Sequence, residues 1–267
     1  MAFIPEIYLK AVVSIGVRNG EAINWIGTGF FLAEKVNDKE IQPYMVTNKH
    51  VLDNKDSVVI RFKRKDVDSL LMVDLPLVNE NGKMYSVHPD AKVDIAVVIL
   101  SGPFIDQNHL EFPAFEINDN SVPSTEFANE GIYEGTLVYM LGYPMGLVNI
   151  NSNHPICRLG CIARTCEEEI KNSKDILLDI QNFPGNSGSP IICRPEVAGL
   201  GKTNVIRKAM LIGIVHSYIP YQETLINCQT GKAVEIRSEN SGIARSHPVE
   251  LIKDVMEIEQ KRVIKKS

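Results

Sequence analysis

Short apolar segments rich in β-branched residues recur along the chain, and this pattern restricts its possible folds more than any other feature of the sequence. Gly, Asn, Asp or Pro separates the segments, as expected for strands that end in turns. The predicted strands are Ala11–Val17, Gly29–Ala33, Tyr44–Thr47, Ser57–Phe62, Ile95–Leu100, Leu137–Leu141, Ile176–Ile180, Pro190–Cys193 and Ala209–Val215. Many short strands separated by turns predict an all-β architecture, either a barrel or a sandwich.

The 267 residues are enough for one large domain or two small ones. The stretch from Gln107 to Glu134 has the weakest apolar periodicity and contains a turn-rich cluster. We therefore predict a first β-rich half over residues 1–115, a linker over residues 116–132 and a second half over residues 133–267. A helix should close the second half, because Pro248 suits a first helical turn and an apolar face follows it.

Charge and composition exclude several classes of partner. Lysine and arginine number 28 and aspartate and glutamate 33, so the net charge is −5 and gives no overall attraction to nucleic acid or to an anionic membrane. No apolar run is long enough for a membrane helix, and the first residues lack the order of a signal peptide. Five cysteines, an odd number, do not indicate a secreted disulfide framework. We expect a cytoplasmic protein without nucleic acid or membrane partners.

Two motifs could belong to a metal or cofactor site. His154 precedes Cys157, Cys161 and Cys166 and could belong to a zinc site, but the spacing is weaker evidence than paired C-x2-C motifs, and small side chains on a strand explain it as well. A phosphate-binding loop ending at Gly201 and Lys202 would need a glycine five residues before Gly201, where Glu196 stands. We expect no metal and no cofactor.

The densest motif with chemical potential is Gly185-Asn186-Ser187-Gly188-Ser189-Pro190. A serine hydroxyl becomes nucleophilic when a base takes its proton and donors stabilise the oxyanion that forms. Glycines on both sides of Ser187 allow a tight turn in which backbone N–H groups converge beside the hydroxyl. The alternative is a surface turn before a strand, which the same residues would also form.

A nucleophilic serine needs a histidine, and His50 is the best placed of the six because it follows an apolar strand. A carboxylate must orient that histidine. Asp94, which opens the apolar run over residues 94–99, is the first candidate, and Asp90, in a predicted turn, competes with it.

Together these segments resemble the chymotrypsin-like (trypsin-like) serine proteases, especially the bacterial branch with Deg/Htr-type proteases and glutamyl endopeptidases. The order His, Asp, Ser is that of the family, and the resemblance runs from about residue 11 to residue 258. The matching segments are Gly27-Thr28-Gly29-Phe30-Phe31, Val46-Thr47-Asn48-Lys49-His50-Val51, Asp94-Ile95-Ala96, Leu141-Gly142-Tyr143-Pro144, Gly185-Asn186-Ser187-Gly188-Ser189-Pro190 and Leu211-Ile212-Gly213-Ile214-Val215.

The resemblance implies two antiparallel six-stranded β-barrels with a C-terminal helix and a cleft between the barrels. It implies that Ser187 attacks the scissile carbonyl, His50 transfers the proton and Asp94 orients His50. The backbone N–H groups of Gly185 and Ser187 would form the oxyanion hole. A protein or peptide would be the substrate.

The chain also departs from the family. Val51 replaces a cysteine that forms a disulfide in many secreted members, and we expect no peptide-binding domain after the protease domain. Asn186 replaces the aspartate that pairs with a new N-terminus in zymogens, so we expect hydrogen bonds of Asn186, or a partner, to set the oxyanion turn.

For the primary specificity pocket, the resemblance points to four residues: Gln181, His216, Ser217 and Tyr218. Gln181 is neutral where a carboxylate would select Lys or Arg. His216 could bind an acidic side chain or could instead face the barrel or solvent.

The predicted function is a serine endopeptidase, with a regulatory protein partner considered possible because an uncontrolled protease would endanger its host. Two alternatives remain. One is a binding module that keeps the triad residues but does not cut, and the other is a hydrolase of non-peptide esters. The G-x-S-x-G motif and the Ser-Asp-His order of α/β-hydrolases are missing, which argues against that fold.

Overall fold

Strands dominate the computed structural model, which describes residues 4–37, 40–149, 151–196 and 204–264. All nine predicted strands coincide with strands of the structure, so the all-β prediction is confirmed. The first half contains α1 (Glu6–Lys10), β1 (Val12–Asn19), β2 (Ala22–Lys35), β3 (Ile41–Thr47), α2 (Lys49–Leu52), β4 (Ser57–Lys63), β5 (Leu70–Pro76), β6 (Val78–Asn79), β7 (Gly82–Lys83), β8 (Ser86–Val87), β9 (Ala96–Ile99), α3 (Gly102–Gln107) and β10 (Phe115–Glu116).

The strands of the first half form one curved sheet in the order β5-β4-β1-β2-β3-β9-β8, and β10 adds to β2 in parallel. The small hairpin of β6 and β7 lies apart from this sheet. Strand pairing does not close the sheet within the described residues, since β5 and β8 are its edges. Neighbours along the sheet are antiparallel, as hairpin connections such as the turn at Gly20 between β1 and β2 require.

The second half is a closed six-stranded barrel in the order β11-β12-β13-β16-β15-β14. Its elements are η1 (Ser124–Glu126), β11 (Leu137–Gly142), the 3-10 turn η2 (Pro144–Gly146), β12 (Ile156–Arg164), α4 (Glu167–Ser173), β13 (Ile176–Asp179), β14 (Pro190–Cys193), β15 (Met210–Ile226), β16 (Ala233–Pro248) and α5 (Val249–Ile264). A closed antiparallel barrel beside a second curved sheet and a C-terminal helix is the chymotrypsin-like architecture. The linker predicted over residues 116–132 stays a prediction.

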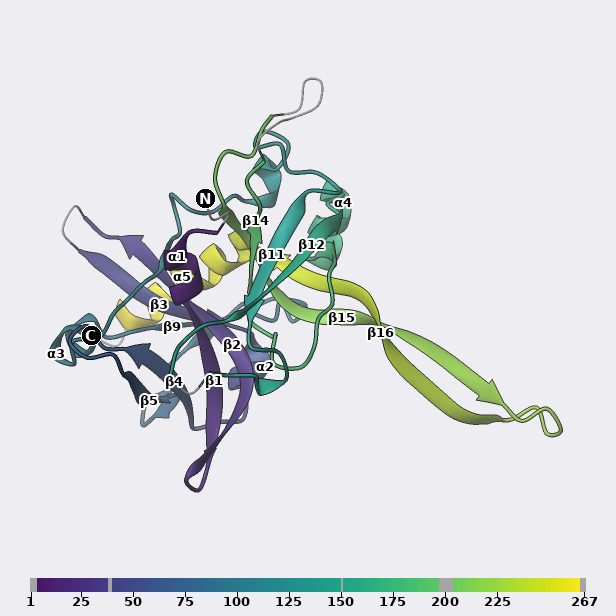
Figure 1. The fold of residues 1–267 in the computed structure, drawn as a ribbon, viewed down its shortest axis with the longest axis horizontal. Coiled ribbons are helices and arrows are strands. Elements are labelled where there is room, and N and C mark those ends of the chain that lie inside the picture. Colours follow the sequence, from purple (N-terminus) through teal and green to yellow (C-terminus); the bar gives the residue numbers. More distant parts are fainter. Residues whose placement is uncertain (1–3, 38–39, 150, 197–203, 265–267) are drawn as a thin grey trace.

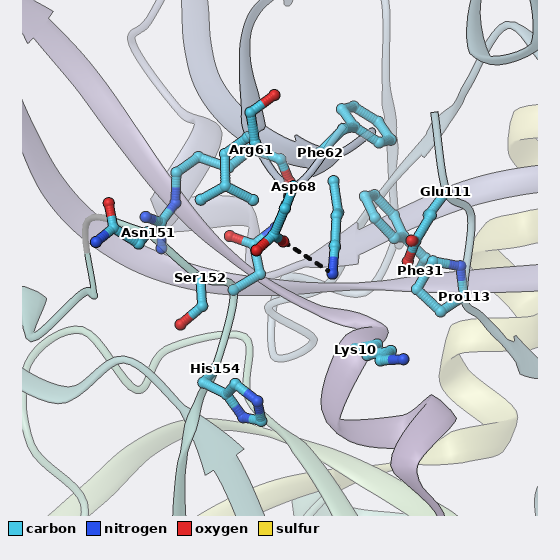
Figure 2. Close-up of a pocket in the computed structure, with 14 residues that line it drawn as sticks. Lys10, Phe31, Arg61, Phe62, Asp68, Glu111, Pro113, Asn151, Ser152 and His154 are labelled. Atoms are coloured by element: carbon cyan, nitrogen blue, oxygen red, sulfur yellow. Dashed lines mark hydrogen bonds and ion pairs between the residues drawn. The ribbon is translucent and has the colours of Figure 1, made fainter. Parts of the chain in front are cut away.

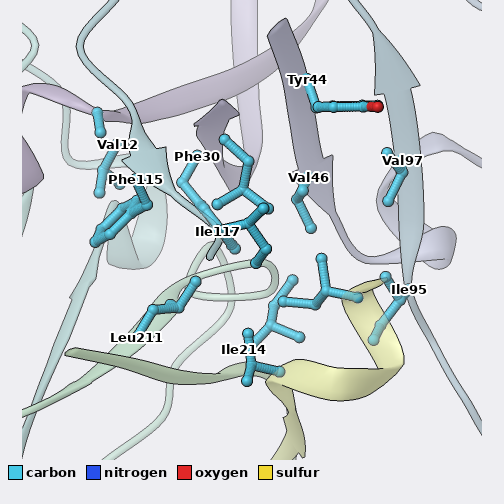
Figure 3. Packing of buried hydrophobic residues seen from close by; sticks show 14 of the residues in the cluster. Val12, Phe30, Tyr44, Val46, Ile95, Val97, Phe115, Ile117, Leu211 and Ile214 are labelled. Carbon is cyan, nitrogen blue, oxygen red and sulfur yellow. The ribbon is translucent and has the colours of Figure 1, made fainter. Parts of the chain in front are cut away.

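Three apolar cores organise the two halves. One fills the first sheet around Ile15, Met45 and Ile60, and another fills the closed barrel. The third lies between the halves, where Phe30 and Val46 of the first half meet Leu211 and Ile214 of the second (Figure 3). Burying such side chains stabilises the fold by about 1.5–3 kcal/mol each. The shared core therefore fixes the two halves against each other.

The predicted C-terminal helix is α5, and its side chains contact both halves of the molecule. Val249 and Ile252 enter the core between the halves. Further along, the fully buried carboxylate of Glu259 accepts a hydrogen bond from the Ser86 hydroxyl at 2.7 Å and pairs with Arg262 at 2.6 Å. The helix thus holds β8 of the first half against the barrel of the second.

The outer parts of β15 and β16 form a long two-stranded arm that extends away from the body (Figure 1). Tyr221, Ile226, Val234 and Ile236 on this arm are exposed. No helix within the described part of the chain is long and apolar enough to cross a membrane.

Candidate active site

His50 and Asp94 lie side by side because their strands do. His50 sits on α2 directly after β3, and Asp94 precedes β9, which pairs with β3 so that Thr47 is opposite Ala96. The Nδ1 atom of His50 lies 2.5 Å from Oδ2 of Asp94, and the His50 backbone N–H donates to Oδ1 at 3.0 Å. Two contacts to one carboxylate fix both the ring and the main chain of His50.

The electrostatics of Asp94 favour a carboxylate. Burial by itself raises the pKa of Asp94, but the hydrogen bonds and charge of His50 outweigh burial and leave the pKa below its usual value. An ionised Asp94 accepts the proton of Nδ1, so that the Nε2 atom of His50 carries the lone pair. The ring is then able to accept a proton at Nε2.

The turn that carries Ser187 depends on glycines. Gly185 has a φ of +94° and Gly188 a φ of +89°. A Cβ at Gly185 would lie 2.4 Å from the Tyr143 carbonyl oxygen, and one at Gly188 would lie 2.0 Å from that of Thr28. Both the backbone conformation and the close approach of neighbouring strands therefore exclude a side chain.

Strand β2 of the first half holds this turn of the second half. The Thr28 N–H donates to the Ser187 carbonyl at 2.9 Å, and the Thr28 hydroxyl donates to the Gly185 carbonyl at 2.7 Å. A Cβ at Gly27 would lie 2.8 Å from Val51 and 3.5 Å from the Ser187 carbonyl oxygen. Since Val51 follows His50, Gly27 lets the helix with His50 approach the turn with Ser187.

Two backbone N–H groups of the turn have no acceptor in the part of the chain that the structure describes. Those of Asn186, Gly188 and Ser189 donate to the carbonyls of Phe183, Val215 and Asn186. Those of Gly185 and Ser187 donate to no acceptor among the described residues. N–H groups without a partner on either side of a serine hydroxyl can stabilise an oxyanion that forms there.

The hydrogen bonds of Asn186 that were expected to set this turn come from its backbone and not from its side chain: its N–H donates to the Phe183 carbonyl at 3.0 Å, and its carbonyl accepts the Ser189 N–H at 2.8 Å. The amide of Asn186 is buried, and neither of its polar atoms has a hydrogen-bond partner in the described part of the chain. The contacts that fix the turn come instead from Thr28 and from the backbone. Sequence reasoning could not find this, because Thr28 lies more than 150 residues before the turn.

A second histidine group lies behind Asp94. The ring of His247 is fully buried, and its Nε2 accepts the Asp94 backbone N–H at 2.9 Å, while Nδ1 lies 2.7 Å from the carbonyl oxygen of Lys174. His216 stacks on His247 with ring centroids 3.9 Å apart, and its Nε2 lies 2.8 Å from Asp175. No local sequence pattern indicates that Asp175, His216 and His247 lie together.

Asp175, His216 and His247 form a hydrogen-bonded network. Burial, and then the nearby charge of His216, lower the pKa of His247 to about 4, so its ring is neutral near pH 7. Burial alone would raise the pKa of Asp175, but His216, His247 and Arg245 bring it below the usual value. Asp175, His216 and His247 offer ligand atoms within 4.8 Å of one another. Both ring nitrogens of His247 are already engaged, however, so that ring has no lone pair free for a metal.

The cysteines considered for zinc do not converge. Cys157 and Cys161 lie four residues apart on β12, which places them about 13 Å apart along an extended strand. Zinc ligands lie about 2.0–2.3 Å from the ion. These two residues cannot share one tetrahedral site, and the set with His154 and Cys166 does not fit a zinc ion.

The four residues expected in a substrate pocket have different surroundings. Gln181 is exposed and Tyr218 partly so, at 38%. The Ser217 carbonyl accepts a hydrogen bond from the Asn182 amide at 2.9 Å. His216 is largely buried, and its Nε2 atom faces the internal carboxylate of Asp175. That nitrogen is not free for a substrate carboxylate.

The comparison with protein families agrees with the architecture. The family model of the trypsin-like peptidase domain matches residues 27–199. No curated protein matches the chain. Among solved structures, an HtrA-type protease, the AlgW variant with a tripeptide, is similar with 18% identity and a TM-score of 0.49, over 94% of this chain and 60% of that chain.

Two further structures are similar. AlgW with a decapeptide has 17% identity and a TM-score of 0.47, over 97% of this chain and 66% of its own. The protease domain of MamO from Magnetospirillum magneticum has 14% identity and a TM-score of 0.46, over 93% of this chain and 97% of its own. The chain thus spans less than two thirds of the length of either AlgW chain.

Proposed function

The chain belongs to the trypsin-like peptidase family, and we propose that it is a serine endopeptidase with Ser187 as nucleophile, His50 as general base and Asp94 as the carboxylate that orients His50. The observation that carries the proposal is the turn at Ser187. Its Gly185 and Ser187 N–H groups lack acceptors in the described part of the chain, and it lies against the helix of the His50–Asp94 pair.

The proposed reaction follows from these positions. The Nε2 atom of His50 takes the proton of the Ser187 hydroxyl as its oxygen attacks the carbonyl carbon of the substrate. The negative charge moves to the carbonyl oxygen, which accepts hydrogen bonds from the N–H groups of Gly185 and Ser187. The imidazolium of His50, held by Asp94, then gives its proton to the leaving amine. Water hydrolyses the acyl-enzyme by the same route.

This turn should be active without cleavage of the N-terminus. Asn186 carries no charge, so a new α-amino group would have no carboxylate to pair with. The contacts of Thr28 already hold the turn. We expect the untrimmed chain to react, either alone or with a regulatory partner.

Labelling with a fluorophosphonate tests the proposal, because this reagent reacts with activated serines. We expect labelling of the wild-type chain and none of Ser187→Ala. Ser189→Ala is the matched control: it makes the same change two residues later, where the buried hydroxyl has no hydrogen-bond partner among the described residues. No labelling of the wild type would favour a binding module that does not cut. Labelling together with turnover of esters but not of peptides would favour the esterase alternative.

A further inference from the structure

Asp94 is held on both sides of its main chain, and the two contacts come from different halves of the molecule. Its carbonyl accepts a hydrogen bond from the Asn48 amide at 2.7 Å. Asn48 directly precedes α2, the helix of His50, so this bond keeps Asp94 beside His50 within the first half. The Asp94 N–H donates to Nε2 of His247 at 2.9 Å, and His247 lies near the end of β16 in the second half. Through His247 the second half therefore contacts the His50–Asp94 pair.

The neighbours of His247 determine which of its ring nitrogens carries the proton. The Lys174 carbonyl oxygen, 2.7 Å from Nδ1, can only accept a hydrogen bond, so Nδ1 carries the proton and Nε2 keeps its lone pair. The ring of His216 stacks on that of His247 at an interplanar angle of 5°. Burial, and then the charge of His216, lower the pKa of His247 to about 4, so the ring is neutral near pH 7. The acceptor that the Asp94 N–H requires is thus fixed in place.

The same end of β16 is tied to the strand that holds the Ser187 turn. His247 pairs with β15, and Val215 of β15 accepts the Gly188 N–H at 3.0 Å. A Cβ at Gly213 would lie 2.4 Å from the His247 carbonyl oxygen, so glycine lets β15 and β16 pack this closely. A continuous path therefore runs from the turn through β15 and β16 to the ring that holds the aspartate.

Other polar contacts join the halves without touching these residues. Beside a pocket lined by Phe31 and Phe62 (Figure 2), Arg61 of β4 donates to the Asn149 carbonyl at 2.6 Å, and the Asn153 amide donates to the Arg61 carbonyl at 2.8 Å. Neither bond involves a residue of the proposed triad. Contact between the halves and contact with the site can therefore be tested separately.

Each half thus holds a part of the site that the other half carries. Thr28 of the first half holds the Ser187 turn, and His247 of the second half holds the Asp94 main chain. We propose that His247 is a positioning residue, whose hydrogen bond to the Asp94 N–H aligns the His50–Asp94 pair with Ser187. This role rests on the proposed function, because alignment matters only if His50 activates Ser187.

The rate of fluorophosphonate labelling tests this role in variants of His247. His247→Phe keeps a ring against His216 but offers no acceptor, and we expect its labelling rate to fall by about 10²-fold, as when a catalytic group is misplaced by about 1 Å. His247→Gln, whose side-chain oxygen takes the place of Nε2, should restore most of the rate. Labelling of His247→Phe at the wild-type rate would overturn the proposal, and so would equal losses in the two variants.

A second variant covers the case in which His247→Phe fails to fold. The amide of His247→Asn takes the place of Nδ1, so it can still donate to the Lys174 carbonyl but is too short to accept the Asp94 N–H. The same fall in labelling rate is expected, again with recovery in His247→Gln. A wild-type rate in His247→Asn would contradict the role as directly as one in His247→Phe.

Two control variants separate alignment from a general loss of stability. Nδ1 of His88 accepts the Asp90 N–H at 3.0 Å, so His88→Phe removes the same kind of contact from an aspartate outside the proposed triad. Asn153→Ala removes a hydrogen bond between the halves beside the pocket of Figure 2. Both variants should be less stable in urea and should keep their labelling rate. A fall in either control as large as that of His247→Phe would overturn the proposal.

The proton between His50 and Asp94 gives a readout that needs no turnover. In Ser187→Ala protein, NMR detects the Nδ1 proton of His50, which is identified by its loss in His50→Gln. We expect its resonance to broaden or disappear in His247→Phe, because a displaced Asp94 leaves the proton open to exchange with water, and to persist in His247→Gln and His88→Phe. An unchanged resonance in His247→Phe would contradict the positioning role, while a wild-type chain that never labels would instead count against the proposed function.

Discussion

Replacing Thr28 by valine should separate the stability of the fold from the geometry of the oxyanion turn. The Thr28 hydroxyl is fully buried, donates to the Gly185 carbonyl at 2.7 Å and accepts the Tyr143 N–H at 3.0 Å. Valine has nearly the same shape but leaves both groups unpaired. Each buried unpaired group costs about 1–3 kcal/mol, so Thr28→Val should lower the free energy of unfolding by about 2–6 kcal/mol.

The same change should slow chemistry at Ser187. Without the hydroxyl, nothing holds the Gly185 carbonyl in its present direction, and the Gly185 N–H on the neighbouring peptide is free to turn away. Loss of one oxyanion donor lowers the rate by about 10²–10³-fold, which sets the upper limit for the drop in the labelling rate. Thr28→Ser, which keeps the hydroxyl, should label almost as fast as the wild type.

Urea unfolding and the second-order rate of fluorophosphonate labelling measure the two effects. Thr136→Val is the control, because Thr136 is also buried and its hydroxyl accepts one backbone N–H, from Tyr133 at 3.0 Å. It should lose about 1–3 kcal/mol of stability and keep its labelling rate. If Thr28→Val loses stability but labels like Thr136→Val, the turn does not depend on Thr28 and the reasoning fails.

Three further predictions concern the residues around His50. Asp94→Asn should lose several orders of magnitude in labelling rate, because the amide favours the wrong tautomer of His50, while Asp90→Asn should stay active; the reverse result would show that the carboxylate is misassigned. The free energy of unfolding should fall by about 3 kcal/mol in total as the pH drops from about 6.5 to 4. The pKa of His247 is about 4 in the folded protein, so over this range the unfolded chain binds a proton at His247 that the folded chain does not bind. His247→Gln, which can still accept the Asp94 N–H, should flatten this part of the pH profile in urea unfolding, and an unchanged slope would show that His247 is not its source. In a peptide library, cleavage after Lys or Arg should not dominate, and His216→Ala should not change selection for acidic P1 residues, since Asp175 already occupies its Nε2; a basic P1 profile would contradict the neutral pocket.

Strands with several buried apolar residues could be predicted from the sequence, and strands with few such residues could not. All nine predicted strands contribute to one of the cores, and their apolar residues show it. Strand β16 was missed over its whole length. Its outer part belongs to the arm, where both faces are exposed and Val234 and Ile236 stand among charged residues, and its inner part buries polar side chains such as Ser246 and His247. Strand β12 was missed for the same reason, since Cys157 and Leu159 face solvent.

Part of the candidate site could likewise be predicted from the sequence, and part of it could not. The segments of His50, Asp94 and Ser187 are local motifs, which a single sequence can reveal. The contacts of His247 with Asp94 and of Thr28 with Gly185 join residues more than 150 positions apart. No local pattern records such pairs, because each residue by itself fits an ordinary strand or helix start.

The hydrogen bonds that hold the Ser187 turn indicate where a ligand or partner would regulate this chain. In zymogens an ion pair formed after cleavage sets the turn, but here Asn186 is neutral and its side chain has no hydrogen-bond partner among the described residues. The turn depends instead on Thr28 of β2 and on the Met145 N–H. Both supports come from outside the turn, one from each half of the molecule. A ligand or partner that shifts either support by a fraction of an ångström would therefore change the oxyanion donors without touching Ser187, and no covalent step would be needed to reverse the change.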